Sequence, residues 1–280
     1  MAKKTISGEL SRRLRKIKPH LAIILTGALR SMRATRNPLR FANAANALRE
    51  LFREMLETLA PDECVIDCHW FVSDPTSKNG VTRKHRILYS IHGYVGIALF
   101  PKKFVHETEN LAKRMLHQID KLQKLTHITE KSLSIPASES KIVFDSVIRS
   151  YLQLLTTIKT GKEVSRGRLA EILSQKLDDV FNEEIFENLN LLSGHTSPQY
   201  TEQVFVTDID DTDKDVISFS GSGSILCELQ YGSDGDVRRG DGLRTEDSYP
   251  FVFSGHASTN LKTVEVDPDS ISIDTSSFYR

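Results

Sequence analysis

The segment Val216–Tyr231 reads VISFSGSGSILCELQY, and its pattern decides which fold class the second half of the chain can adopt. Apolar residues alternate with small polar ones on both sides of Gly221–Gly223, as they do in half-buried strands. If Gly221–Gly223 forms a three-residue turn, Ser220 pairs with Ser224 and one face of the hairpin collects the apolar side chains. That buried face would consist of Ile217, Phe219, Ile225, Cys227 and Leu229.

Other short runs rich in β-branched and aromatic residues lie on either side of this hairpin, separated by Gly, Asp and Ser. Such runs are typical of antiparallel strands joined by turns. Together with the hairpin they predict about six strands, at residues 203–207, 216–220, 225–231, 249–253, 263–266 and 271–274.

Helical periodicity dominates the chain up to about residue 195. In residues 37–59, apolar side chains recur at steps of three and four, which indicates a helix with one buried stripe. The stripe consists of Phe41, Ala45, Leu48, Phe52, Met55 and Leu59. Asn37 is placed to cap this helix and Pro61 to end it.

Further helices are expected near residues 104–125 and 141–158 and between residues 165 and 192, and Gly194–Pro198 has the composition of a linker. The sequence therefore predicts an α+β protein. Its α-helical bundle region, with a basic amino-terminal segment, would occupy residues 1–195, and a small, acidic, antiparallel β domain would occupy residues 200–280.

The formal net charge of the 280 residues is zero, but the two ends carry opposite charges. Residues 1–53 hold 13 Lys and Arg against 2 acids, a net charge of +11, whereas residues 200–280 hold 6 against 16, a net charge of −10. A basic segment of this kind can follow the phosphates of a nucleic acid. It can equally dock on the acidic end of its own chain or form a solvated helix face.

The longest uncharged apolar run, Leu21–Leu29, is far shorter than the ~20 residues that span a bilayer. We therefore expect a soluble protein without a membrane partner. The three cysteines are an odd number, which argues against a disulfide framework and favours the cytoplasm.

Several stretches of the sequence resemble one known family. They are NPLRFANAANALRELFREMLETLAPDE at residues 37–63, Trp70, TRKHRILY at residues 82–89, ELQYGSDGDVRRGDG at residues 228–242 and YPF at residues 249–251. Their combination is similar to the predicted pPIWI-associated nuclease families of bacterial anti-phage systems. The resemblance implies a defence protein with nuclease activity on nucleic acid and a protein partner from the same operon. It implies no particular catalytic residues.

One candidate site pairs Asp215 with Glu228 and Gln230, at a spacing similar to the Asp…Glu-x-Lys hairpin of restriction-type nucleases, with Gln in place of Lys. Such a site needs two carboxylates on one face, so that they hold Mg²⁺ while water attacks the phosphate. The predicted hairpin register places Asp215 on the apolar face and Glu228 on the other. The hydrophobic pattern therefore argues against this pair unless a bulge shifts the register.

The loop at residues 230–242 reads QYGSDGDVRRGDG and combines acids, arginines and glycines. Part of it resembles a calcium loop, but Arg238 and Thr245 stand where acids are needed. The simpler interpretation is a structured turn. If the chain is a nuclease, no other segment offers the same groups for phosphoryl chemistry. The predicted catalytic residues are Glu228, Gln230, Asp234, Asp236 and Asp241, with Mg²⁺ or Mn²⁺ held by Glu228 and Asp236.

The basic side chains predict where nucleic acid would bind. The candidate contacts are Arg83, Lys84 and Arg86 in the helical region and Arg238 and Arg239 in the loop. Two functional classes remain open. The chain is either a metal-dependent nuclease, or a non-catalytic adaptor or sensor, without a cofactor, that binds a partner protein or nucleic acid through its β domain and basic helices.

Overall fold

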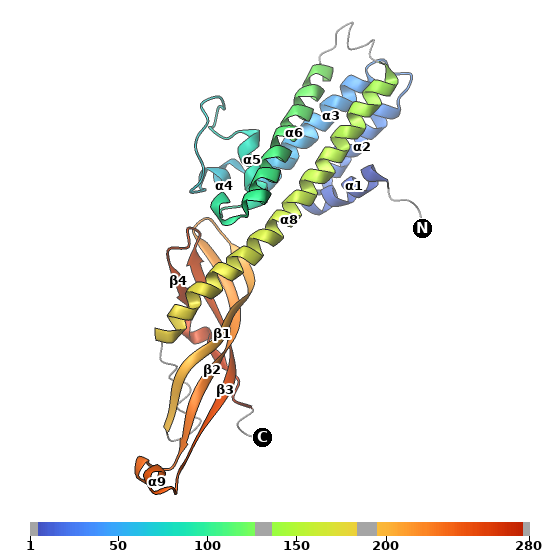
Figure 1. Cartoon of the computed structure of the whole chain (residues 1–280). Coiled ribbons are helices and arrows are strands. Elements are labelled where there is room, and N and C mark those ends of the chain that lie inside the picture. Colours follow the sequence, from blue (N-terminus) through green and yellow to red (C-terminus); the bar gives the residue numbers. More distant parts are fainter. Residues whose placement is uncertain (1–4, 127–135, 184–194, 277–280) are drawn as a thin grey trace. The chain divides into compact units, whose positions relative to one another are not determined.

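The computed structural model describes residues 5–126, 136–183 and 195–276, and the chain divides into two compact units (Figure 1). We call residues 1–164 the helical unit and residues 165–280 the sheet unit. Helix α8, Ala137–Glu183, contributes residues to both. The predicted α+β class is confirmed, because helices fill the first part and an antiparallel sheet follows.

The helical unit is built from amphipathic helices around one apolar core. Besides the first part of α8, they are α1 Ile6–Ile17, α2 Pro19–Arg33, α3 Arg40–Leu59, α4 Asp62–Ile66, α5 Arg83–His92 and α6 Lys102–Thr126, with a 3₁₀ turn at Ile97–Leu99. Most of the predicted stripe of α3 faces the core: Ala45, Leu48, Phe52 and Met55 are buried and Leu59 packs against the core, whereas Phe41 is half-buried outside it. In the core, Phe52 stacks on Tyr151 of α8 with 5.7 Å between ring centroids. The buried Tyr151 hydroxyl donates to the Leu48 carbonyl at 2.7 Å, which joins α8 to α3.

The cap of α3 differs from the prediction. The helix begins at Arg40, and the Asn37 side chain accepts a hydrogen bond from the Leu39 backbone instead of capping the first helical turn. The helix ends at Leu59, two residues before Pro61, as predicted.

A buried histidine, His92, lies at the end of α5. His92 is 4% exposed, its ring lies 4.4 Å from the Phe100 ring centroid, and neither ring nitrogen has a hydrogen-bond partner among the described residues. Burial lowers the pKa of His92 to about 4, against an ordinary value of 6.5. The folded helical unit therefore holds this imidazole neutral.

Because His92 is buried in its neutral form, we expect the free energy of unfolding to fall in mild acid. Between pH 6.5 and pH 4 the unfolded chain takes up a proton at His92 that the folded chain does not, so stability falls as the pH falls through this window. A shift of this size corresponds to about 3 kcal/mol of unfolding free energy. Urea unfolding at pH 7 and pH 4.5 should show that His92→Leu loses less stability than the unchanged chain. Equal losses would contradict this account.

The sheet unit consists of an antiparallel sheet in the order β1-β2-β3-β4, with β5 paired to β3. The strands are β1 His195–Thr212, β2 Val216–Tyr231, β3 Leu243–Ser258, β4 Val264–Val266 and β5 Ser272–Ile273. The second part of α8 covers one face of the three long strands (Figure 1). There the Phe181 ring lies 5.2 Å from Phe251 and 4.9 Å from Phe253, between ring centroids.

The predicted turn at Gly221–Gly223 is wrong, because β2 runs unbroken through it and replaces two of the predicted strands. Both glycines pair with β3, Gly221 opposite Phe253 and Gly223 opposite Phe251. A Cβ atom on either glycine would overlap these rings. The glycines are therefore present because they make room for phenylalanine on the buried face, and not because the chain turns.

The predicted apolar face is nevertheless confirmed, because the alternation of two continues across the glycines. All five predicted residues are at most 2% exposed: Ile217, Phe219, Ile225, Cys227 and Leu229. The three cysteines of the chain are free thiols, of which Cys68 and Cys227 are buried.

Candidate functional site

The predicted loop forms the connection between β2 and β3, and it contains a short helix, α9, Asp234–Arg239 (Figure 1). Ser233 caps it, because its hydroxyl accepts from the Asp236 backbone while the Asp236 carboxylate accepts from the Ser233 backbone at 2.8 Å. Gly240 ends the helix in the left-handed conformation, with φ 84°, which glycine adopts most readily. We call residues 228–244 the tip.

One cluster of charged groups at the tip holds α9 together. Both oxygens of Asp236 are engaged, Oδ2 by Ser233 and Oδ1 by the Arg239 guanidinium at 2.5 Å. Arg239 also lies 3.6 Å from Asp241. The Ser233 hydrogen bonds, and to a lesser extent Arg239, hold the pKa of Asp236 below its ordinary value.

A second cluster surrounds Arg244 at the start of β3. The register places Arg244 opposite Gln230, and the guanidinium Nε donates to the Gln230 side-chain oxygen at 2.8 Å. The same guanidinium lies 3.8 Å from Glu228 and 3.8 Å from Asp234. Gln230, which is 6% exposed, donates to Asp234 at 2.9 Å. Glu228, Gln230 and Asp234 therefore converge on one cation.

The predicted tip residues thus come together as two groups. Glu228, Gln230 and Asp234 gather around Arg244, while Asp236 and Asp241 gather around Arg239. Arg238 is exposed. In the second group Asp236 belongs to the cap of α9. In the first group Glu228, Gln230 and Asp234 surround Arg244 and take no part in that cap.

The tip does not fit a divalent ion in this arrangement. Within residues 5–126, 136–183 and 195–276, no three His, Cys, Asp or Glu side chains are grouped so that they could hold a metal. The Arg244 guanidinium lies beside both Glu228 and Asp234, where a bound cation would have to sit. The second predicted ligand, Asp236, uses both oxygens in the cap of α9.

The alternative pair with Asp215 is separated by the length of a strand. Asp215 precedes β2 and Glu228 lies near its far end. Thirteen residues of extended chain span roughly 40 Å, so these carboxylates cannot share a metal ion in this fold.

The basic residues predicted in the helical unit have different surroundings. Arg83 and Lys84 are exposed in the first turn of α5. Arg86 is half-buried and forms an ion pair with Asp62 at 2.6 Å and a hydrogen bond to the Ala60 carbonyl at 2.5 Å. In this conformation Arg86 joins α5 to the end of α3. Of the three predicted residues, only Arg83 and Lys84 are therefore open to a phosphate.

The two units carry opposite charges of equal size. The helical unit has 28 Lys and Arg against 15 acids, a net charge of +13, and the sheet unit has 9 against 22, a net charge of −13. A polyanion is therefore attracted to the helical unit and repelled by most of the sheet unit. The arginines of the tip are local exceptions to the acidity of the sheet unit.

Sequence reasoning missed Ser233 and Arg244. The signal for Ser233 was present, because Ser-x-x-Asp at residues 233–236 is a capping box. The role of Arg244 depends on the strand register across α9, for which the local sequence gives no signal.

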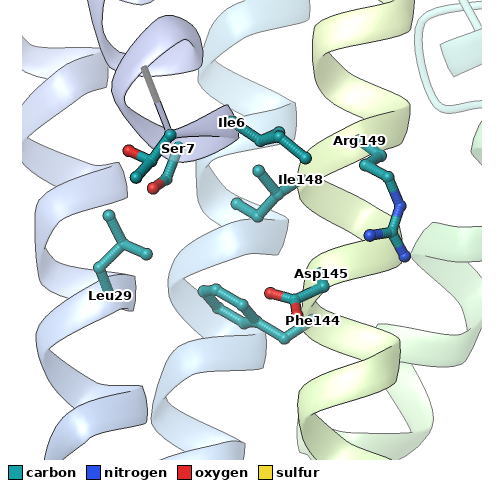
Figure 2. A pocket seen from close by; sticks show the side chains of 8 residues that line it. Ile6, Ser7, Leu29, Phe144, Asp145, Ile148 and Arg149 are labelled. Carbon is teal, nitrogen blue, oxygen red and sulfur yellow. The ribbon is translucent and has the colours of Figure 1, made fainter. Parts of the chain in front are cut away.

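A separate cavity of about 420 Å³ lies in the helical unit among α1, α2 and α8 (Figure 2). Phe144 and Ile148 of α8 face Leu29 of α2, with Asp145 and Arg149 beside them on α8. No buried polar atom that lacks a partner lines it, as far as the described residues go. We assign no chemistry to this cavity.

A basic helical unit and an acidic antiparallel sheet with a tip of carboxylates and arginines define a two-unit α+β protein. Two family models match the chain, one over residues 14–151 and one over residues 141–279, and both describe a predicted pPIWI-associating nuclease. Together they cover nearly the whole chain and overlap within α8. The chain therefore belongs to the predicted pPIWI-associating nucleases, which confirms the resemblance seen in the sequence.

Neither the curated proteins nor the solved structures contain a significant match. No helix in the described part of the chain is long and apolar enough to cross a membrane.

Proposed function

We propose that this chain is a component of a bacterial anti-phage defence system that binds nucleic acid and hydrolyses its phosphodiester bonds at the tip. Membership of the predicted pPIWI-associating nucleases supports the reaction class. The observation that carries the site is the convergence of Glu228, Gln230 and Asp234 on Arg244. Carboxylates that accept a proton beside a cation that neutralises phosphate are the groups that this hydrolysis requires.

Each member of the cluster has a role in the proposal. Glu228, one third of whose side chain is exposed, takes a proton from water while the water oxygen forms a bond to phosphorus. The bond between phosphorus and the leaving oxygen breaks, and the leaving oxygen takes a proton from solvent. Arg244 stabilises the charge that develops on the phosphoryl oxygens. Gln230 holds Arg244 in place, and Asp234 orients Gln230.

Mg²⁺ or Mn²⁺ is the cofactor that we predict for a nuclease of this family, but we derive no step through it. An ion between Glu228 and Asp234 would require Arg244 to leave both carboxylates. Asp236 and Asp241 were also predicted as catalytic residues from the sequence. In this proposal they instead stabilise α9 through their ion pairs with Arg239.

The positive charge of the helical unit predicts nucleic-acid binding that weakens as salt rises. Filter binding with single-stranded oligonucleotides at 50 and 200 mM salt should show a steep loss of affinity. Changing Arg83 and Lys84 together to Glu should weaken binding and make the salt dependence less steep, because each lost phosphate contact lowers the slope by about 1. The same charge reversal at the exposed Lys262 of the sheet unit should have little effect. An affinity that changes neither with salt nor with the substitution of Arg83 and Lys84 would contradict binding through the helical unit.

A second candidate function is favoured by the position of Arg244, which lies beside both Glu228 and Asp234 where a metal ion would have to bind. In that case the chain is a non-catalytic adaptor or sensor, and the tip or the sheet contacts a protein partner of the same operon. Stable association with such a partner, together with intact nucleic-acid binding and no cleavage, would support this candidate.

A further inference from the structure

Four arginines occur in the short stretch of chain where α2 passes into α3. Arg30 and Arg33 are in the last turn of α2, Arg36 is in the connection, and Arg40 is the first residue of α3. We call residues 30–40 the arginine turn. Arg30, Arg33 and Arg36 are exposed and Arg40 is half-buried, so three of the four side chains are open to a ligand from solution.

Hydrogen bonds within the connection hold the backbone of the arginine turn. The Asn37 amide donates to the Ala34 carbonyl at 2.9 Å, and the Arg40 amide donates to the Asn37 carbonyl at 3.2 Å. The Asn37 side chain accepts from the Leu39 amide at 2.9 Å. The spacing of the arginine backbones is therefore set before a ligand binds, which lowers the entropic cost of binding.

No described carboxylate forms an ion pair with the four arginines. Residues 10–49 contain ten Lys and Arg and no Asp or Glu. Elsewhere in the helical unit arginines are paired, Arg12 and Arg13 with Glu9 and Arg53 with three glutamates. The positive charge of the arginine turn thus lacks the local compensation that these other arginines have.

The helix dipoles account for only part of this charge. Arg30 and Arg33 lie at the carboxyl end of α2, where cations are favoured, but Arg40 opens α3, and the amino end of a helix disfavours cations. Arg30 and Arg33 are also like charges three residues apart on one helix face, and they repel each other. A bound polyanion would offset this repulsion.

Arg40 is held over an aromatic ring. Its Cζ atom lies 4.6 Å from the centroid of the Phe41 ring, and Phe41 is half-buried outside the apolar core. A guanidinium in this position keeps its planar set of N–H donors in a fixed place, which suits the oxygens of a phosphate. Arginines beside aromatic rings are typical of surfaces that bind nucleic-acid strands.

The arginine turn and the predicted contacts Arg83 and Lys84 lie at opposite ends of α3. Arg86, which follows them in α5, donates to the Ala60 carbonyl directly after α3, whereas Arg40 is the first residue of α3. A helix of 20 residues is about 30 Å long, so the two basic sites are separate. Substitutions at the two sites should therefore have additive effects on binding.

We propose that the arginine turn binds successive phosphates of a nucleic-acid strand, at a second site besides Arg83 and Lys84. The choice of a nucleic acid rests on the proposed function, whereas the site rests on the uncompensated arginines. Contacts with phosphates carry no sequence information, so this site binds strands irrespective of their sequence.

The test is a fluorescence-anisotropy titration of the full chain with labelled single-stranded oligonucleotides of two unrelated sequences, between 50 and 200 mM salt. Changing Arg33 and Arg36 together to Gln should weaken binding of both oligonucleotides about tenfold at the lower salt and lower the salt slope by about 2. Arg30→Gln with Arg36→Gln should have the same effect. Both pairs consist of exposed residues without an ion pair, so Tm should not change.

The matched control is Arg12→Gln with Lys159→Gln. It removes the same two charges from the helical unit, at exposed positions that form ion pairs with Glu9 and Glu163. Affinity and salt slope should stay close to those of the unchanged chain.

Equal affinities and slopes in the arginine-turn variants and the control would overturn the inference, because only net charge would then matter. Binding to phosphatidylserine vesicles that depends on Arg33 and Arg36, with oligonucleotide binding unaffected, would overturn it in favour of a lipid surface. If the variants bind and cleave as the unchanged chain does, the arginine turn fails as a site and the proposed function stands. If the unchanged chain binds no oligonucleotide, the proposed function fails together with this inference.

Discussion

Replacing Glu228 with Gln is expected to reduce the rate of nucleic-acid cleavage at least 100-fold, with little change in Tm. General-base catalysis contributes about 10²- to 10⁴-fold to such reactions, and the amide of Gln cannot accept the proton from water. Glu228 lies at the surface of the sheet and contacts Arg244 at 3.8 Å, so the near-isosteric amide should leave the fold intact. Asp234→Asn should lower the rate as well, because Asp234 orients Gln230, although we expect a smaller loss.

Glu246 provides the matched control for Glu228. It lies directly opposite Glu228 in the register of β2 and β3, and it is exposed. Glu246→Gln therefore removes a carboxylate beside Glu228 but keeps Glu228 itself and the contacts of Arg244 with Gln230, Glu228 and Asp234, and cleavage should continue at nearly the original rate. Equal rates in both variants, or a matching loss of stability in Glu228→Gln, would remove the evidence for a site at the tip.

Gly221→Ala should destabilise the sheet unit strongly, by about 3 kcal/mol. The added Cβ would overlap the Phe253 ring and lie 2.5 Å from the backbone carbonyl oxygen of Phe205. Both neighbours belong to adjacent strands, and a backbone oxygen cannot move aside without breaking the pairing of β1 with β2. Urea unfolding followed by circular dichroism measures the loss.

Gly27→Ala in α2 is the control for this substitution. Nothing lies within 4 Å of a Cβ atom at Gly27, and alanine favours a helix over glycine by about 1 kcal/mol. The control should therefore be as stable as the unchanged chain or more so. If Gly221→Ala were also neutral, β2 would not run unbroken beneath Phe253, and the turn that the sequence suggests would regain support.

Local patterns were sufficient to predict the fold class. The steps of three and four in α3 and the alternation of two in β2 each follow from which side chains a single element must bury. The Gly-Ser-Gly stretch led to the wrong prediction of a turn, because a turn and a close approach of phenylalanine rings both require glycine. Only the pairing with Phe251 and Phe253, some thirty residues away in the chain, distinguishes the two.

The sequence pattern was also sufficient to predict part of the arrangement at the tip. The sequence shows that Glu228 and Gln230 leave the apolar face of their strand, and the structure has Gln230 paired with Arg244. The sequence does not show that Arg244 lies beside both Glu228 and Asp234, because that position depends on the register between β2 and β3 across α9. The capping box at Ser233 was visible in the sequence, and it explains why Asp236 belongs to the helix cap.

Incubation of the purified full chain with end-labelled DNA and RNA, single- and double-stranded, in Mg²⁺, in Mn²⁺ and in a chelator tests catalysis at the tip most directly. The proposed function predicts shortened products from at least one substrate, which disappear in Glu228→Gln and persist in Glu246→Gln. The chain would then be a nuclease that acts through its tip. Salt-sensitive binding by a folded chain that yields no product from any substrate would contradict catalysis and favour the adaptor.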